Sequence, residues 1–167
     1  MSTTVCVIIL MGVAGAGKST VGRALAKELG WRFVDGDDFH PPANFDKINR
    51  NLPLTDEDRR PWLEHLQAAL TGWVTTGTPV VLACSLLKAA HRAMVLAHSK
   101  HQVRIAYLKA DRPLLKQRLL DRTDHVMKAD LLDSQLDTLE EPIHTLVLDA
   151  SESPQRLTQR IREAFEL

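Results

Sequence analysis

The chain has 167 residues, of which 44% are hydrophobic, and its basic and acidic side chains balance to a formal net charge of +0. This length suits one domain with one core, and neutral charge is not typical of proteins that bind nucleic acid or anionic lipid. The longest apolar runs are near strand length, and the start of the chain lacks the pattern of a signal peptide. We therefore expect a soluble, cytoplasmic protein that binds neither nucleic acid nor membranes.

Strand-like and helix-like segments alternate along the chain. We predict strands over residues 5–10, 79–85, 103–109 and 145–150, and a short strand that runs into a polar turn within residues 31–38. Helical periodicity covers residues 19–29, 58–77, 86–99 and 111–123, and a last helix carries Leu157, Ile161 and Phe165 four apart. Alternation of this kind predicts an α/β fold, a five-stranded parallel sheet covered by helices on both faces. Cys6 and Cys84 fall in apolar runs, where we expect buried, reduced thiols; a catalytic thiol at Cys84 is the alternative.

A phosphate-binding loop follows the first predicted strand. Gly12, Gly17, Lys18 and Ser19 fit the P-loop pattern G-x-x-x-x-G-K-[ST], in which backbone N–H groups surround phosphate oxygens. Lys18 then reaches the β and γ phosphates, and the Ser19 hydroxyl ligates Mg²⁺. The predicted nucleotide-binding residues are Gly12, Val13, Ala14, Gly15, Ala16, Gly17, Lys18, Ser19 and Thr20.

Two aspartates follow the second predicted strand, and ligands of parallel sheets bind beyond the carboxyl ends of the strands. The third strand ends in "LACS", without the acid that usually supports the magnesium, so we predict that Asp35 takes that role through water. Asp37 is the candidate to orient and deprotonate an attacking hydroxyl. The alternative is that both aspartates only form a turn.

Arg118 and Arg122 lie four residues apart on one predicted helix face, and His125 and Lys128 follow in a stretch with little apolar periodicity. This pattern is typical of a short lid over a polyphosphate, since arginine is permanently charged and forks onto phosphate oxygens. A solvated charged face is the alternative.

Taken together, these residues resemble gluconokinases, small P-loop gluconate kinases of the adenylate-kinase-like group. The resemblance runs from the phosphate loop through "DGDDFHPPANFDKINRNLPLTDEDRRPWL" and "CSLLKAAHR" to "DHVMKADLLDSQLDTLEEP". Its specific part is G-D-x-x-H followed by P-L-x-D-x-D-R-x-P-W-L. Shikimate kinases do not share this block, although they are similar in size and also carry D-x-D after the second strand.

The resemblance implies ATP-dependent transfer of phosphate to the terminal hydroxyl of D-gluconate, giving 6-phosphogluconate and ADP. It also implies a single kinase domain over residues 1–167, with a helical substrate-binding segment at about 38–76, a small helical lid at about 119–135, and commonly a homodimer. The implied acceptor-side residues are Asp37, His40, Arg59, Lys88, Arg92 and Gln135. Arg118 and Arg122 match the lid arginines, and the loop after the fifth strand would pass near the adenine.

The chemistry of an open-chain sugar acid agrees with these implied roles. Its carboxylate calls for cations at one end of a pocket, which Lys88, Arg92 and Arg59 supply. Its hydroxyls call for donors and acceptors along the pocket, which Asp37, His40 and Gln135 supply. The alternatives are that His40 closes a turn before Pro41, that Arg59 pairs with Asp56, and that Gln135 is a surface residue.

Three positions depart from the gluconokinase pattern. Leu86 stands where a small residue is usual, so it either narrows the acceptor pocket or points into the core. His91 stands where Tyr is common, and Asn51 replaces a glycine in a turn, where Asn tolerates a left-handed conformation. Two other functions stay open: a kinase for another small hydroxy acid such as shikimate, and a non-catalytic nucleotide-binding regulator. The presence of Lys18, Ser19 and Asp37 argues against the regulator.

Overall fold

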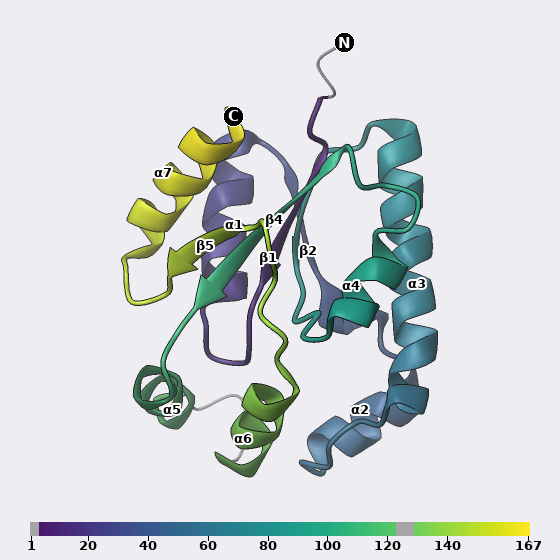
Figure 1. Ribbon diagram of the computed structural model, residues 1–167, viewed down its shortest axis with the longest axis vertical. Helices are drawn as coiled ribbons and strands as arrows, with labels where there is room; N and C mark the ends of the chain where they lie inside the picture. The colour runs from purple at the N-terminus through teal and green to yellow at the C-terminus, as the bar shows by residue number, and fades with distance from the viewer. Residues whose placement is uncertain (1–3, 123–128) are drawn as a thin grey trace.

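Five parallel strands form one sheet in the order β2-β3-β1-β4-β5 (Figure 1). The computed structural model describes residues 4–122 and 129–167. The strands are β1 (Val7–Met11), β2 (Arg32–Asp35), β3 (Val80–Ala83), β4 (Val103–Lys109) and β5 (Leu146–Asp149). The predicted five-stranded parallel sheet is therefore confirmed.

Seven α-helices and one 3₁₀ helix occur in the described residues. They are α1 (Lys18–Leu29), the 3₁₀ helix η1 (Gly36–Phe39), α2 (Pro42–Asn49), α3 (Asp56–Thr76), α4 (Ala89–Val95), α5 (Arg112–Leu120), α6 (Ala129–Thr138) and α7 (Pro154–Phe165). None of the described helices is long and apolar enough to cross a membrane.

Helices cover both faces of the sheet, so the fold has three layers (Figure 1). Successive side chains of a strand point to opposite faces, and β1 divides its buried residues accordingly. Ile8 and Leu10 pack in the core with α1 and α7, whereas Val7 and Ile9 pack in the core with α3 and α4. All of β1 is buried, which explains why this central strand reads as a continuous apolar run.

Helices α2, α5 and α6 gather at the end of the molecule where the strands point (Figure 1). The phosphate loop lies at the same end, because it connects the end of β1 to the start of α1. The fold thus brings the segments after β1, β2, β3 and β4 to one rim.

Several boundaries differ from the sequence prediction. The short strand expected within residues 31–38 ends at Asp35, and the polar turn after it is η1, because the Asp35 side chain accepts a hydrogen bond from the backbone N–H of Asp37 and caps this helix. Helix α4 spans only Ala89–Val95 of the predicted 86–99. Helices α2 and α6 were not predicted by periodicity. Of the expected lid at about 119–135, residues 123–128, with His125, lie outside the described part of the chain.

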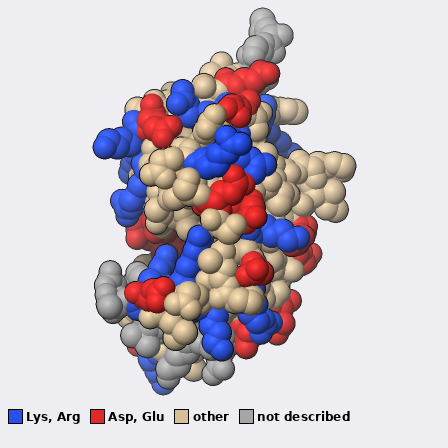
Figure 2. All heavy atoms as spheres, turned by 90° about the vertical axis from the view of Figure 1, so that its left-hand side faces the viewer, with Lys and Arg blue, Asp and Glu red and all other residues tan. Residues whose placement is uncertain are grey.

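Charged side chains of both signs are interspersed on the face that carries α7 (Figure 2). Ion pairs such as Arg162 with Glu28, at 3.4 Å, cross from α7 to α1 on this side. No patch of a single sign dominates this face, in agreement with the balanced composition.

Candidate active site

The phosphate-binding loop turns at the carboxyl end of β1 and leads directly into α1, which begins at Lys18. The N-terminus of a helix attracts anions because its first N–H groups have no partner within the helix. Gly15 and Gly17 have φ angles of 86° and 96°, a left-handed conformation that favours glycine. The glycines of the motif therefore shape the loop as its phosphate-binding role requires.

Lys18 lies close to both predicted aspartates. Its Nζ donates a hydrogen bond to the carbonyl oxygen of Val13 at 3.0 Å. Burial lowers the pKa of Lys18, while the charges of Asp37 and Asp35 act in the opposite direction. The ammonium group thus stands between the loop and the acidic pair that follows β2.

Arg118 holds the phosphate loop from α5. Its guanidinium donates hydrogen bonds to the carbonyl oxygens of Gly15 at 3.3 Å, Ala16 at 3.2 Å and Ala150 at 2.7 Å. With Arg122 it borders a cleft whose other residues come from the loop, α1, the end of α5, the segment after β5 and the start of α7: Gly15, Ala16, Gly17, Thr20, Val21, Asp121, Ala150, Glu152, Pro154 and Leu157. The segment after β5 therefore meets the loop in a cleft suited to the rest of a nucleotide.

Gln135 connects α6 to the same loop. Its side-chain Oε1 accepts a hydrogen bond from the backbone N–H of Ala14 at 2.8 Å. Gln135 is therefore not merely a surface residue, because its side chain contacts the backbone of the phosphate loop.

The residues predicted to support a metal lie together. The Ser19 hydroxyl donates to Asp35 Oδ2 at 3.4 Å, and Asp35 Oδ1 accepts from the N–H of Asp37 at 3.0 Å. Hydroxyl and carboxylate oxygens are ligands that Mg²⁺ prefers, and Mg²⁺ usually keeps water and substrate phosphate as its other ligands. The described residues contain no group of three or more His, Cys, Asp or Glu side chains that would hold a metal alone. The pair thus fits Mg²⁺ bound mainly through the nucleotide.

Gly36 fixes the two aspartates against β3. A Cβ atom at Gly36 would lie 2.8 Å from Cys84 Sγ and 2.9 Å from the carbonyl oxygen of Ala83. The Trp62 indole N–H donates to the Gly36 carbonyl at 2.8 Å from the other side. Burial raises the pKa of the Cys84 thiol, which is free and buried as predicted, so a catalytic thiol there is disfavoured.

A cavity opens beyond Asp37, between η1, α2, α3 and α6. Of the predicted acceptor-side residues, Asp37, His40, Arg59 and Gln135 line it. The remaining lining residues are Ile48, Leu52, Pro53, Leu54, Trp62, Ser85, Leu87, His91, Leu131, Ser134 and Thr138. Asp37 therefore borders the cavity and also lies near Lys18, where a hydroxyl in the cavity would meet a phosphate on the loop.

His40 is buried at the wall of this cavity. Its ring stacks on Trp62, with centroids 4.5 Å apart, and its Nε2 lies 4.0 Å from Asp37 Oδ1. Burial, with a smaller contribution from the charge of Arg59, lowers the pKa of His40 to about 4. His40 is therefore neutral at physiological pH.

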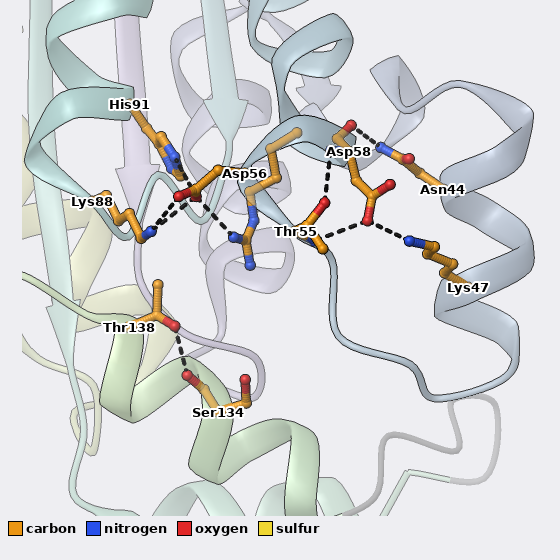
Figure 3. Close-up of polar contacts among 10 residues, drawn as sticks. Asn44, Lys47, Thr55, Asp56, Asp58, Lys88, His91, Ser134 and Thr138 are labelled. Atoms are coloured by element: carbon orange, nitrogen blue, oxygen red, sulfur yellow. Dashed lines mark hydrogen bonds and ion pairs between the residues drawn. The ribbon is translucent and has the colours of Figure 1, made fainter.

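Three basic side chains converge on the carboxylate of Asp56 at the start of α3 (Figure 3). Lys88 Nζ lies 2.8 Å from Asp56 Oδ1, Arg59 Nη1 lies 3.5 Å away and His91 Nε2 lies 3.6 Å away. The hydrogen bond from Lys88 is the main reason that the pKa of Asp56 is lowered. Arg59 thus pairs with Asp56 and also lines the cavity, so the ion pair does not remove it from the acceptor side.

A capping box fixes the start of α3 and ties it to α2 (Figure 3). Thr55 and Asp58 exchange hydrogen bonds between side chain and backbone, and Lys47 lies 2.6 Å from Asp58 Oδ2. The hydrogen bond from Lys47 lowers the pKa of Asp58 to about 2. This capping positions both Asp56 and Arg59.

Arg92 differs from its expected role as an acceptor-side cation. Its side chain is buried and donates to the carbonyl oxygens of Leu86 at 2.8 Å, Leu87 at 3.1 Å and Glu140 at 2.9 Å. The guanidinium is thus occupied by backbone carbonyls, and its role in this structure is to hold the loop after β3 to the segment after α6.

Two of the departures from the family pattern are explained by the structure. Leu86 is fully buried in the core between the sheet and α3, while its neighbours Ser85 and Leu87 line the cavity. Leu86 therefore points into the core and does not narrow the cavity. Asn51 has a φ of 55°, which confirms the left-handed conformation predicted for it.

Sequence reasoning missed the roles of Asn44 and Trp62. Asn44 is buried and contacts His40, and Trp62 both stacks on His40 and bonds to Gly36. The spacing of Asn44, four residues after His40, was the available signal. Trp62 was assigned to the core, which is correct but incomplete.

Comparisons with known proteins point to one family. A family model described as an AAA domain matches residues 7–142. The gluconokinase of Gluconobacter oxydans is 43% identical over 135 residues, which cover 81% of this chain and 75% of that protein. The crystal structure of a gluconokinase from Sinorhizobium meliloti matches with a TM-score of 0.86 and 33% identity, covering 99% of this chain and 93% of that chain.

A more distant likeness concerns the fold alone. The structure of shikimate kinase from Acinetobacter baumannii in complex with shikimate matches with a TM-score of 0.66 but only 21% identity, covering 98% of this chain and 94% of that chain. The P-loop kinase fold is therefore common to both groups, whereas the higher identity lies with the gluconokinases. From its loop, its two-part site and these similarities, we conclude that the chain belongs to the gluconokinase family.

Proposed function

We propose that the chain transfers the γ-phosphoryl group of ATP to the terminal hydroxyl of D-gluconate, giving 6-phosphogluconate and ADP. One observation carries the proposal: Asp37 lines the acceptor cavity and lies beside Asp35, which contacts the Ser19 hydroxyl of the phosphate loop. A hydroxyl held at Asp37 would face a phosphate held by the loop.

In this proposal, the loop amides and Lys18 bind the phosphates, and Asp37 orients the acceptor hydroxyl and receives its proton. Arg118 and Arg122 supply positive charge beside the loop, where charge spreads over the transferred group. Mg²⁺, when bound near Ser19 and Asp35, would neutralise charge on the phosphate oxygens.

The acceptor cavity suits a sugar acid in charge and polarity. Arg59, with Lys88 close by, provides cations for a carboxylate, and Asp56 holds these groups together. Burial lowers the pKa of His91, so its ring offers a neutral hydrogen-bonding group. Asp37, His40 and Gln135 offer donors and acceptors to a row of hydroxyls. Arg92 takes no direct part in this proposal, because it does not line the cavity and its guanidinium donates three hydrogen bonds to backbone carbonyls.

Further proposals concern the organisation of the protein. We infer a single kinase domain over residues 1–167 with a substrate-binding segment at about 38–76, because η1, α2 and α3 supply much of the cavity wall. A lid at about 119–135, a homodimer and a cytoplasmic location are proposed from the resemblance to gluconokinases. Interactions with nucleic acid or membranes are not part of the proposal.

The test is ADP formation by the purified protein with Mg-ATP and D-gluconate, shikimate, other sugar acids or no acceptor. We expect turnover that depends strongly and selectively on D-gluconate. A preference for shikimate or another acid would replace the proposed substrate, and ATP binding without acceptor-dependent turnover would favour a non-catalytic role.

A further inference from the structure

Asn44 links His40 to helix α3 through a single nitrogen atom. Its side chain is buried, with 2% of its surface exposed. The amide Nδ2 lies 2.8 Å from the backbone carbonyl oxygen of Asp58 and 3.1 Å from Nδ1 of His40. Figure 3 shows the contact between Asn44 and Asp58. One NH₂ group thus contacts both the backbone of helix α3 and the ring of His40 at the cavity wall.

The two contacts determine which ring nitrogen of His40 carries the proton. A backbone carbonyl only accepts hydrogen bonds, so the end of the Asn44 amide that faces Asp58 must be the NH₂ group. The same nitrogen has no lone pair to offer His40, so Nδ1 of His40 must accept. In a neutral imidazole the proton then resides on Nε2.

The ring has little freedom to escape this arrangement. One face of His40 stacks on Trp62 with an interplanar angle of 15°, and Phe45 contacts the ring edge-to-face with centroids 6.2 Å apart. The ionisable groups that face His40 are Asp37, 4.0 Å from Nε2, and Arg59, whose positive charge disfavours a second proton on the ring. The ring is therefore neutral, and its Nε2–H points toward Asp37 at the cavity.

We propose that Asn44 is a positioning residue that holds His40 as the Nε2–H tautomer, so that His40 donates a hydrogen bond to an acceptor oxygen and Asp37 alone receives the proton. The proposal rests on the function proposed above, in which a hydroxyl of the substrate lies between these two side chains. The Nδ1–H tautomer would present a bare nitrogen to the same hydroxyl, and it would compete with Asp37 as a base.

The tautomer is measured directly by long-range proton–nitrogen NMR correlations of the histidine rings in isotope-labelled protein, with His40 assigned by the His40→Gln variant. We expect a protonated Nε2 and an unprotonated Nδ1 for His40 at neutral pH. An Nδ1–H tautomer, or a doubly protonated ring, would overturn the proposal without reference to any activity.

The kinetics of Asn44→Ala test whether the tautomer of His40 affects the reaction. We expect kcat/KM for D-gluconate to fall about tenfold, as for loss of one productive hydrogen bond, with KM for ATP unchanged. The same variant should show a mixed His40 tautomer. Asp46→Ala is the matched control, because Asp46 is an exposed residue of the same helix and its ion pair is with Arg50 at the end of α2. It should keep both the tautomer and the gluconate kinetics.

A double-mutant cycle separates positioning from a general structural role. If Asn44 acts through His40, Asn44→Ala should cost little further activity in the His40→Gln background. Fully additive losses, or equal losses in Asn44→Ala and Asp46→Ala, would contradict the proposal. Absence of gluconate-dependent turnover in the unmodified protein, with the Nε2–H tautomer present, would instead refute the proposed function and leave the tautomer assignment standing.

Discussion

At the scale of single residues, Asp37 joins the two parts of the site, and Asp37→Asn tests its role. The amide keeps the size of the side chain but accepts no proton. We expect ATP binding to persist and turnover to fall about 10²-fold or more, the usual contribution of a general base. Measured kcat and nucleotide affinity check this. Asp38→Asn, at the exposed neighbouring position, is the control, and unchanged turnover in Asp37→Asn would remove Asp37 from the mechanism.

His40 predicts how stability depends on pH. Its pKa is lowered from 6.5 to about 4 in the folded chain, so between these values the unfolded chain binds a proton that the folded chain does not. Stability should therefore be greatest above pH 6.5 and fall as the pH is lowered toward 4, by up to about 3 kcal/mol for the full shift. Urea unfolding across this range checks it against His40→Gln. Parallel pH profiles for the two proteins would contradict the prediction.

Candidate residues could be named from the sequence where the signal is local. The loop residues Gly12 to Thr20 follow from a motif whose spacing encodes one backbone shape, and Asp35 and Asp37 follow from their place after a strand. Arg92 could not be assigned from sequence, because its three carbonyl partners come from the loop after β3 and from Glu140 after α6. Such partners are set by tertiary structure and have no signal in residue type.

At the scale of elements, the short turn that carries the aspartates depends on the absence of a side chain at Gly36. A Cβ there would approach Cys84 and the backbone of Ala83 too closely, so Gly36→Ala must displace η1 from β3. We expect the free energy of unfolding to fall by about 1–3 kcal/mol. Turnover should fall by a larger fraction than the free energy of unfolding does, because Asp37 moves with the turn.

Gly72→Ala provides the control for this substitution. A Cβ at Gly72 meets no atom within 4 Å, and the residue lies inside helix α3. We expect a gain of about 0.5–1 kcal/mol from the better helix former, with activity unchanged. Thermal unfolding and turnover of both variants check the pair, and equal effects would show that the close approach at Gly36 is unimportant.

The turn after β3 carries an unusual leucine. Leu86 is fully buried yet has a φ of 39°, a conformation that costs a branched side chain about 1–2 kcal/mol. Leu86→Ala should destabilise the protein by about 2–5 kcal/mol through the cavity that it leaves. Leu86→Gly should be no less stable than Leu86→Ala, although glycine is normally the worse of the two, because it relieves the backbone strain. A less stable glycine variant in urea unfolding would contradict this.

Two helices, α2 and α6, were not predicted by the periodicity of the sequence, for identifiable reasons. Helix α2 has only eight residues and buries a polar side chain, Asn44, so it shows no apolar periodicity. Helix α6 comes after a stretch with few apolar residues, so no periodicity marks where it begins. Its Leu132 is nevertheless buried in the core that contains residues of α1 and α7. Both helices are held by partners distant in sequence, through Lys47 with Asp58 and through Gln135 with Ala14.

At the scale of the whole molecule, a sheet with alternating helices brings four polar segments to one rim. The parallel sheet with helices on both faces was predictable, because buried parallel strands are continuous apolar runs and their connections are helical. The order of the strands was not predicted and comes from the structure. The acceptor cavity was harder to predict from the sequence, because it forms only where α2, α3 and α6 meet. Its residues were expected from the resemblance to gluconokinases, whereas their hydrogen bonds required the structure.

The central claim is that phosphate moves from the loop side of Asp37 to a hydroxyl on the cavity side. The most direct measurement is phosphorus NMR of the product formed from Mg-ATP and D-gluconate, with Lys18→Ala as the inactive control. We predict a phosphomonoester whose phosphorus couples to a terminal CH₂ group, absent from the control although the variant remains folded. A phosphate on a secondary carbon, no phosphorylated gluconate, or the same product from Lys18→Ala would contradict this account.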